Sequence, residues 1–278
     1  MNIFENYYRE LFPSDFESIM EGLKQPTKPV LRFAAKNEKR MRKLWKEAGL
    51  EWKVLDWCSC ALKWPKGVEI GETLPGTDEG LFYVQNASSL LPVLALDPQP
   101  DDRVLDCCAA PGGKALFIWD LMQGEGELLA NDISNARRGR MRRIFAEHDC
   151  AAKIMGRNAA SFGGTHKEYF DRILLDAPCS SEKHVLNSPR HLKEWKPGRV
   201  RHLRKLQWRL IQALFKALKP GGRLVYSTCS ITPEENEELI KRFVHKLEGG
   251  VKLIKEERIW PHKQENMDPM FIAVFEKV

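Results

Sequence analysis

The chain has 278 residues, of which 43% are hydrophobic and 29% charged, and its formal net charge is +6. This composition fits a globular protein with a sizeable core, either one large α/β domain or a larger domain with a small appendage. No apolar run approaches the ~18 to 20 residues of a membrane span, and residues 1–9 lack the apolar core of a signal peptide. The seven cysteines are odd in number and scattered, which favours a reducing compartment. We therefore expect a cytoplasmic protein without membrane contact.

The segment 1–77 is predicted to form a small α+β N-terminal domain. Its pattern indicates a helix near residues 5–20, a basic amphipathic helix near 37–48 and tryptophan-rich strands around 52–64. The sequence Leu74-Pro75-Gly76-Thr77 indicates a break in regular structure. We place a domain boundary there and expect residues 78–278 to form a second, larger domain.

Strands and helices alternate from about residue 80 onward, as in βαβ units, so the fold class is predicted to be α/β with a mostly parallel sheet. The seven predicted strands lie at 103–107, 127–132, 152–156, 171–176, 223–228, 251–256 and 270–276. Helices are predicted at 114–122, 135–148, 203–218 and 233–247. Thr232, Pro233 and Glu235 predict a capping-box start for the last of these helices.

A glycine-rich turn follows the first strand of this sheet. It consists of Cys108, Ala109, Ala110, Pro111, Gly112, Gly113 and Lys114. Two glycines between a strand and a helix let backbone amides approach a nucleotide or a carboxylate closely. Ala115 stands where a phosphate-binding loop needs a hydroxyl, which disfavours a nucleoside triphosphate hydrolase. An ordinary tight turn is the alternative interpretation.

The second strand ends at Asp132, roughly 20 residues after the glycine turn, where a carboxylate can bind the hydroxyls of a ribose. This position predicts an adenosine-type ligand. An Asx turn or a helix cap is the alternative.

Two cysteines follow the predicted fourth and fifth strands. Cys179 ends the run that begins at Asp176, and Cys229 lies in Ser227-Thr228-Cys229-Ser230. If these strands pair, both thiols lie at the same edge of the sheet. A lone buried cysteine is usually a packing residue, but a thiolate is a strong nucleophile once its pKa falls. The remaining cysteines do not complete a tetrahedral zinc site, so no metal is expected.

Four blocks together resemble the Sun-type RNA (cytosine-5) methyltransferases, which use S-adenosylmethionine. The blocks are Cys108 to Lys114, Asp132, Asp176 to Cys179, and Tyr226 to Ser230, and the resemblance runs from about Tyr83 to the C-terminus. It implies a Rossmann-like methyltransferase sheet of seven strands with the last strand antiparallel. It also implies methyl transfer to C5 of a cytosine in RNA, with ribosomal RNA favoured and transfer RNA as the alternative.

The resemblance implies a role for each matched residue. Cys229 would attack C6 of the cytosine, and Cys179 would assist removal of the C5 proton and release of the product. Asp176 would hydrogen-bond the base near N3 and would also face the cofactor. The turn from Cys108 to Lys114 would hold the methionine end of S-adenosylmethionine, and Asp132 would hold the ribose.

Two positions depart from the usual pattern of that family. Asn158 stands where an aspartate usually contacts the adenine amine, although the amide oxygen of asparagine can still accept a hydrogen bond. The loop after Cys179 continues with Ser180-Ser181 in place of the more frequent Ser-Gly.

Basic residues gather in three runs, within 36–46, 137–143 and 190–209. A one-sided positive field would attract a phosphate backbone, whereas an ordinary solvated face is the alternative for each run. With the N-terminal domain, these runs predict RNA as the partner. A base must leave its stack to reach two thiols, so looped or single-stranded RNA is expected.

Two other functions stay open. One is an RNA-binding ribosome-assembly factor that keeps the fold with little activity. The other is methylation of a protein or a small molecule, which the paired thiols disfavour. No heptad pattern suggests an oligomer, so a monomer is predicted.

Overall fold

The computed structural model describes residues 2–264 and 266–278. Its larger sheet has seven strands in the order β10-β11-β9-β8-β5-β6-β7. The strands are β5 (Arg103–Asp106), β6 (Glu127–Asn131), β7 (Lys153–Met155), β8 (Phe170–Asp176), β9 (Leu218–Thr228), β10 (Val251–Ile259) and β11 (Met270–Lys277). Strands β5 to β9 pair in parallel, and β11 runs antiparallel to both β9 and β10. The predicted fold class, with the last strand antiparallel, is confirmed.

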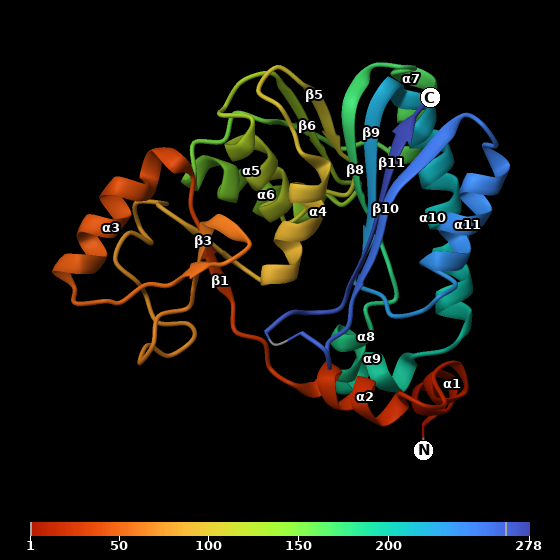
Figure 1. Cartoon of the computed structure of the whole chain (residues 1–278), viewed down its shortest axis with the longest axis horizontal. Helices are drawn as coiled ribbons and strands as arrows, with labels where there is room; N and C mark the ends of the chain where they lie inside the picture. Colours follow the sequence, from red (N-terminus) through yellow and green to blue (C-terminus); the bar gives the residue numbers. More distant parts are fainter. Residues whose placement is uncertain (1, 265) are drawn as a thin grey trace.

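Helices cover both faces of this sheet (Figure 1). Side chains alternate across a strand, so Val104 joins one buried cluster with α4 (Leu91–Leu96), α5 (Gly113–Leu121) and α6 (Asn135–Glu147). Its neighbour Leu105 joins the cluster on the opposite face, which includes α7 (Phe162–Thr165), α10 (Gly198–Ala217) and α11 (Glu237–Lys246). A short 3₁₀ turn, η3 (Ala159–Ser161), precedes α7.

A smaller antiparallel sheet has the order β2-β3-β1-β4. Its strands are β1 (Val30–Arg32), β2 (Val54–Leu55), β3 (Cys58–Lys63) and β4 (Tyr83–Gln85). Helix α3 (Glu38–Glu47), entered through η1 (Ala35–Asn37), buries Met41 and Trp45 against it. The turn η2 (Ala87–Leu90) then leads into α4.

The single helix predicted near residues 5–20 is wrong. The structure has two helices, α1 (Ile3–Leu11) and α2 (Phe16–Lys24), with Pro13 between them. Proline lacks a backbone N–H and clashes with the preceding turn, so the first helix ends before it. Both helices pack against α8 (Glu182–Leu186) and α9 (Pro189–Glu194), at the edge of the molecule away from α3 (Figure 1).

The domain boundary at residue 77 stays a prediction. Strand β4 lies beyond it and completes the small sheet, while α1 and α2 bury their apolar faces with residues from the second half of the chain. In the described part of the chain, every helix is too short or too polar to cross a membrane.

The predicted capping-box start of the last helix is also wrong. Helix α11 begins at Glu237, with Asn236 before it. The Glu235 carboxylate accepts hydrogen bonds from the Ser180 amide and the Gln207 side chain. It does not accept one from the Thr232 amide, as a capping box requires, because that amide donates to Ser230. Asn236 is held in turn by Thr228 and Ser230. Long-range partners therefore delay the helix start.

Candidate functional site

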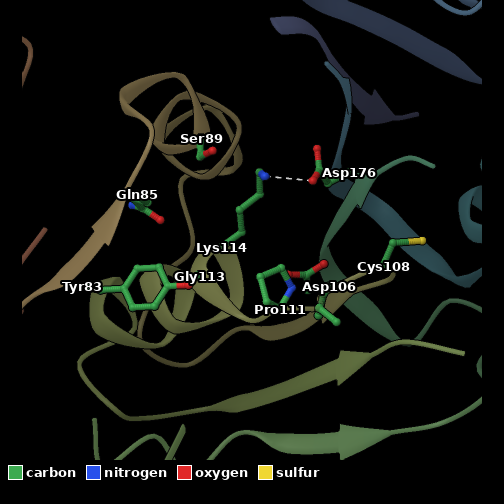
Figure 2. Close-up of a pocket in the computed structure, with 11 residues that line it drawn as sticks. Tyr83, Gln85, Ser89, Asp106, Cys108, Pro111, Gly113, Lys114 and Asp176 are labelled. Carbon is green, nitrogen blue, oxygen red and sulfur yellow. Dashed lines mark ion pairs between the residues drawn. The ribbon is translucent and has the colours of Figure 1, made fainter. Parts of the chain in front are cut away.

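A cavity of about 130 Å³ lies at the carboxyl ends of β5 and β8. Most of the predicted glycine turn lines it, together with residues from β4 and η2 on the opposite side (Figure 2). The lining residues are Tyr83, Gln85, Ser89, Asp106, Cys108, Ala109, Ala110, Pro111, Gly113, Lys114 and Asp176. Carboxyl ends of parallel strands are where open α/β sheets bind ligands.

The two glycines of the turn are required for different structural reasons. Gly112 has φ +121°, which L side chains rarely adopt, and it does not line the cavity. A Cβ at Gly113 would lie 2.6 Å from Cε1 of Tyr83. Only glycine lets the start of α5 approach β4 this closely.

Lys114 and Asp176 form an ion pair across the cavity (Figure 2), with 2.8 Å between Nζ and Oδ2. Ser227 donates a hydrogen bond of 2.8 Å to the other oxygen of Asp176. Burial has the largest single effect and lowers the pKa of Lys114. The charge and hydrogen bond of Asp176, together with the charges of Asp106 and Cys229, outweigh it, so the pKa is raised overall. Lys114 therefore stays charged and fixes the orientation of Asp176.

Asp106 is a site residue that sequence reasoning missed. It is fully buried, it lines the cavity, and neither carboxylate oxygen accepts a hydrogen bond of normal geometry from a described residue. Burial, followed by the charge of Asp176, raises the pKa of Asp106 to about 8. Its position as the last residue of β5 was the available signal. A buried carboxyl group without a partner at a cavity wall is suited to a polar or cationic ligand group.

The two predicted thiols meet. Asp176 pairs with Ser227 in the register of β8 and β9, and the loops that follow place Sγ of Cys179 3.1 Å from Sγ of Cys229. The hydrogen bond to Cys229, followed by burial, raises the pKa of Cys179 well above its ordinary value. The raised pKa favours the thiol form of Cys179, and either sulfur can be the donor in this hydrogen bond. Cys229 lies close enough to Lys114 that a negative charge on the Cys229 sulfur raises the pKa of the Lys114 amine.

A buried polar network holds the two cysteine loops together. The carboxylates of Glu182 and Glu235 are fully buried, and the hydroxyl of Ser180 contacts both. Ser230 follows Cys229, and its Oγ lies 3.3 Å from Oε1 of Glu182 and 3.2 Å from Oε1 of Glu235. Burial, followed by the charge of Glu182, raises the pKa of Glu235 to about 7. The residues that follow both cysteines thus share one pair of carboxyl groups, which sequence reasoning also missed.

Asp132 and Asn158 lie outside the cavity wall. Asp132 is buried; one oxygen accepts a hydrogen bond of 2.8 Å from the Ser134 amide, and the other lies 3.0 Å from Nη1 of Arg137. Arg137 also donates to the carbonyl oxygen of Ala110, so it links the glycine turn to Asp132. Asn158 accepts a hydrogen bond of 3.1 Å from the Ala160 amide and begins η3. The roles assigned to both residues stay predictions.

Within the described ranges, no group of three or more His, Cys, Asp and Glu side chains could hold a metal ion. The cavity does suit the methionine end of S-adenosylmethionine, because an ammonium group can pair with Asp106. The backbone of the glycine turn offers polar groups at close approach as well.

Comparisons with known proteins identify the family. The family model described as 16S rRNA methyltransferase RsmB/F matches residues 93–276. The chain is 39% identical over 179 residues to a tRNA (cytosine(49)-C(5))-methyltransferase of Pyrococcus abyssi, covering 63% of this chain and 57% of the relative. It is 37% identical over 245 residues to ribosomal RNA small subunit methyltransferase F of Escherichia fergusonii, covering 82% of this chain and 50% of the relative.

The chain spans about half the length of these curated relatives. A solved structure of a methyltransferase homologue from Pyrococcus horikoshii is 28% identical, with a TM-score of 0.82, and the match covers 98% of this chain and 93% of that one. The paired cysteine loops, the glycine turn and these matches lead to one conclusion: the chain belongs to the RsmB/F family of 16S rRNA methyltransferases.

Proposed function

We propose that this protein transfers a methyl group from S-adenosylmethionine to C5 of a cytosine in RNA. The observation that carries the proposal is the convergence of two thiols. Sγ of Cys179 and Sγ of Cys229 lie 3.1 Å apart, beside a cavity that bears Asp176 and Lys114. Direct methyl transfer to nitrogen or oxygen needs no nucleophilic cysteine. A pair of thiols at the carboxyl ends of adjacent strands therefore favours transfer to carbon.

The cofactor, when bound, supplies an electrophilic methyl group. In our proposal the turn from Cys108 to Lys114 and the Asp106 carboxyl group hold its methionine end. Asp132 holds the ribose, which requires Arg137 to share or release its ion pair with that carboxylate. Asn158 contacts the adenine through its amide oxygen.

The chemical steps then follow from the chain's own groups. Cys229, as a thiolate, attacks C6 of the cytosine and makes C5 nucleophilic. Asp176, held by Lys114 and Ser227, faces the N3 edge of the base and stabilises the adduct, which requires its carboxyl group to carry a proton at that step. After methylation the C5 proton passes to solvent with the assistance of Cys179. The electron pair of the C5–H bond re-forms the C5–C6 double bond, and the C6–S bond breaks to release Cys229 as a thiolate.

We infer an RNA substrate from charge and from a groove lined by aromatic side chains, of which Trp57 is exposed. A groove of about 490 Å³ beside the small sheet is lined by Trp52, Trp57 and Trp64, along with lysines that include Lys53 and Lys66. Trp57, in the turn between β2 and β3, is 42% exposed. Exposed aromatic rings between cations are suited to stacking on the bases of single-stranded RNA. Residues 1–77 thus contribute to RNA binding in this proposal, and ribosomal RNA is the favoured substrate.

The experiment measures transfer of labelled methyl groups to protein-free ribosomal RNA, partly assembled small subunits and transfer RNA. We expect transfer to one of the ribosomal substrates, and bisulfite sequencing of that RNA identifies the cytosine. Cys229→Ala should abolish transfer while cofactor binding remains. Full transfer by that variant would refute the covalent mechanism. A ribosome-assembly factor with little activity would instead bind RNA without transfer by the wild-type protein.

A further inference from the structure

The loop after Cys179 contains a serine with an unusual backbone. Ser181 has φ +54° and ψ +60°, which is the left-handed region. A non-glycine residue there is strained, because its Cβ comes too close to the backbone. A serine at this position therefore needs a reason in the surrounding structure, and its side chain supplies one.

The hydroxyl of Ser181 contacts both sulfurs of the site. Its Oγ lies 3.2 Å from Sγ of Cys229 and 3.4 Å from Sγ of Cys179. Ser181 immediately precedes α8, where a serine hydroxyl usually accepts a hydrogen bond from the helix backbone, but here no such cap bond forms. The hydroxyl is directed toward the sulfurs, and it also lies 3.4 Å from the carbonyl oxygen of Cys179, a second acceptor for its proton.

Few groups of the described residues can form a hydrogen bond with the sulfur of Cys229. Cys179 and Ser181 are the groups of the described chain that lie within hydrogen-bonding distance of the Cys229 sulfur. The charged and titratable groups around the two sulfurs come from other elements: Lys114 on α5, Asp176 on β8 and Glu235 before α11. The Lys114 ammonium already pairs with Asp176 at 2.8 Å, and Glu235 opposes a negative charge nearby.

We propose that Ser181 is a catalytic residue whose hydroxyl donates a hydrogen bond to the Cys229 thiolate, and so stabilises this sulfur in its nucleophilic form. The inference rests on the proposed function for its role in turnover. Cys229 gives its own proton to solvent before the attack, and Ser181 keeps its proton throughout. When the C6–S bond breaks, the same hydroxyl stabilises the departing thiolate. Hydrogen bonds to ionised groups are about twice as strong as those between neutral groups.

The first variants remove the hydroxyl in two ways. Ser181→Gly takes away the side chain and suits the positive φ, so a lost function in this variant does not come from backbone strain. Ser181→Ala takes away the hydroxyl and keeps the Cβ. Ser181→Thr restores a hydroxyl at the price of a β-branched side chain. The matched control is Gln123→Gly, because Gln123 has φ +58° in an exposed turn after α5.

The measurement is the pH dependence of Cys229 alkylation by iodoacetamide, followed by mass spectrometry of the Cys229 peptide in the full chain without RNA. We expect the midpoint to move up by about 1 pH unit in Ser181→Gly and Ser181→Ala, as loss of one hydrogen bond to a charge predicts. Ser181→Thr should return toward the wild-type midpoint, and Gln123→Gly should match it. The acidic limb of the methyl-transfer rate should move by the same amount.

An unchanged Cys229 midpoint in Ser181→Gly would overturn the proposal. The other outcome is that the Cys229 midpoint shifts in the variants while neither the wild-type protein nor any variant transfers a methyl group to RNA. That result would overturn the proposed function but would support the hydrogen bond from Ser181 to the thiolate. A loss of transfer in Ser181→Ala that Ser181→Gly fully recovers, with no shift in the midpoint, would assign the serine a backbone role and would refute the catalytic one.

Discussion

The buried carboxyl groups of Glu182 and Glu235, which contact the loops of the two thiols, give a specific prediction about stability. The pKa of Glu235 rises from the ordinary 4.5 to about 7, through burial first and then through the charge of Glu182. The folded state therefore binds this proton more tightly than the unfolded state. Its contribution to stability is fully present below the unfolded pKa and is lost as the pH rises through the folded pKa. A difference of about 2.5 pH units, at about 1.4 kcal/mol per unit, corresponds to about 3.5 kcal/mol.

Glu235→Gln removes this titration while keeping the shape of the side chain. The glutamine oxygen can accept from the Ser180 amide and from Gln207, as the carboxylate oxygen does now. Its amide group then faces the hydroxyls of Ser230 and Thr232, which can turn to accept. The variant should therefore fold, and between pH 5 and 8 its free energy of unfolding should rise relative to the wild type by up to about 3 kcal/mol.

The assay is urea unfolding followed by tryptophan fluorescence at pH 5, 6, 7 and 8. Glu125→Gln is the matched control, because Glu125 is exposed, and its stability profile should run parallel to that of the wild type. If the Glu235→Gln profile also stays parallel to the wild type over this range, the pKa of Glu235 is not raised in the folded state as we describe.

Three further changes test the site and the RNA surface. Gly113→Ala places a Cβ 2.6 Å from Tyr83, so it should destabilise the fold by about 1 to 3 kcal/mol and weaken S-adenosylmethionine binding measured by calorimetry. Cys179→Ala should accumulate a covalent adduct through Cys229, visible as an RNA-shifted band on a denaturing gel. Trp57→Ala should lower the affinity for single-stranded RNA by about 1 to 3 kcal/mol in a fluorescence titration, with little change in stability because the ring is 42% exposed.

Each of these changes has a matched control. Gly139→Ala adds a Cβ with nothing within 4 Å, so a similar loss of cofactor binding there would contradict the close-approach argument. Cys150→Ala removes a buried thiol outside the site and should form no adduct; a Cys179→Ala protein without adduct would exclude the release role. Ile70→Ala truncates another exposed apolar side chain, and equal RNA binding by Trp57→Ala and wild type would refute stacking at that position.

Local pattern was enough to place the main sheet and the first half of the site. The strands that end at Asp106, Asn131 and Asp176 are short buried runs, and hydrophobic pattern reports such runs directly. The Cys108 to Lys114 turn is one continuous segment between a strand and a helix, so its place at the sheet edge follows from chain order. Strand pairing then brings Cys179 and Cys229 together, as the parallel arrangement predicts.

Tertiary packing decided the features that depend on contacts between distant segments of the chain. The start of α11 moved because Glu235 bonds to Ser180 and Gln207 on distant segments, and α1 and α2 took their place by burying apolar side chains against Trp195 and its neighbours. The unpartnered Asp106 carboxyl group and the Ser181 hydroxyl between two sulfurs likewise depend on contacts between segments far apart in the chain. Hydrophobic periodicity and capping preferences describe only neighbouring residues, whereas burial, pKa and side-chain direction are properties of the packed environment.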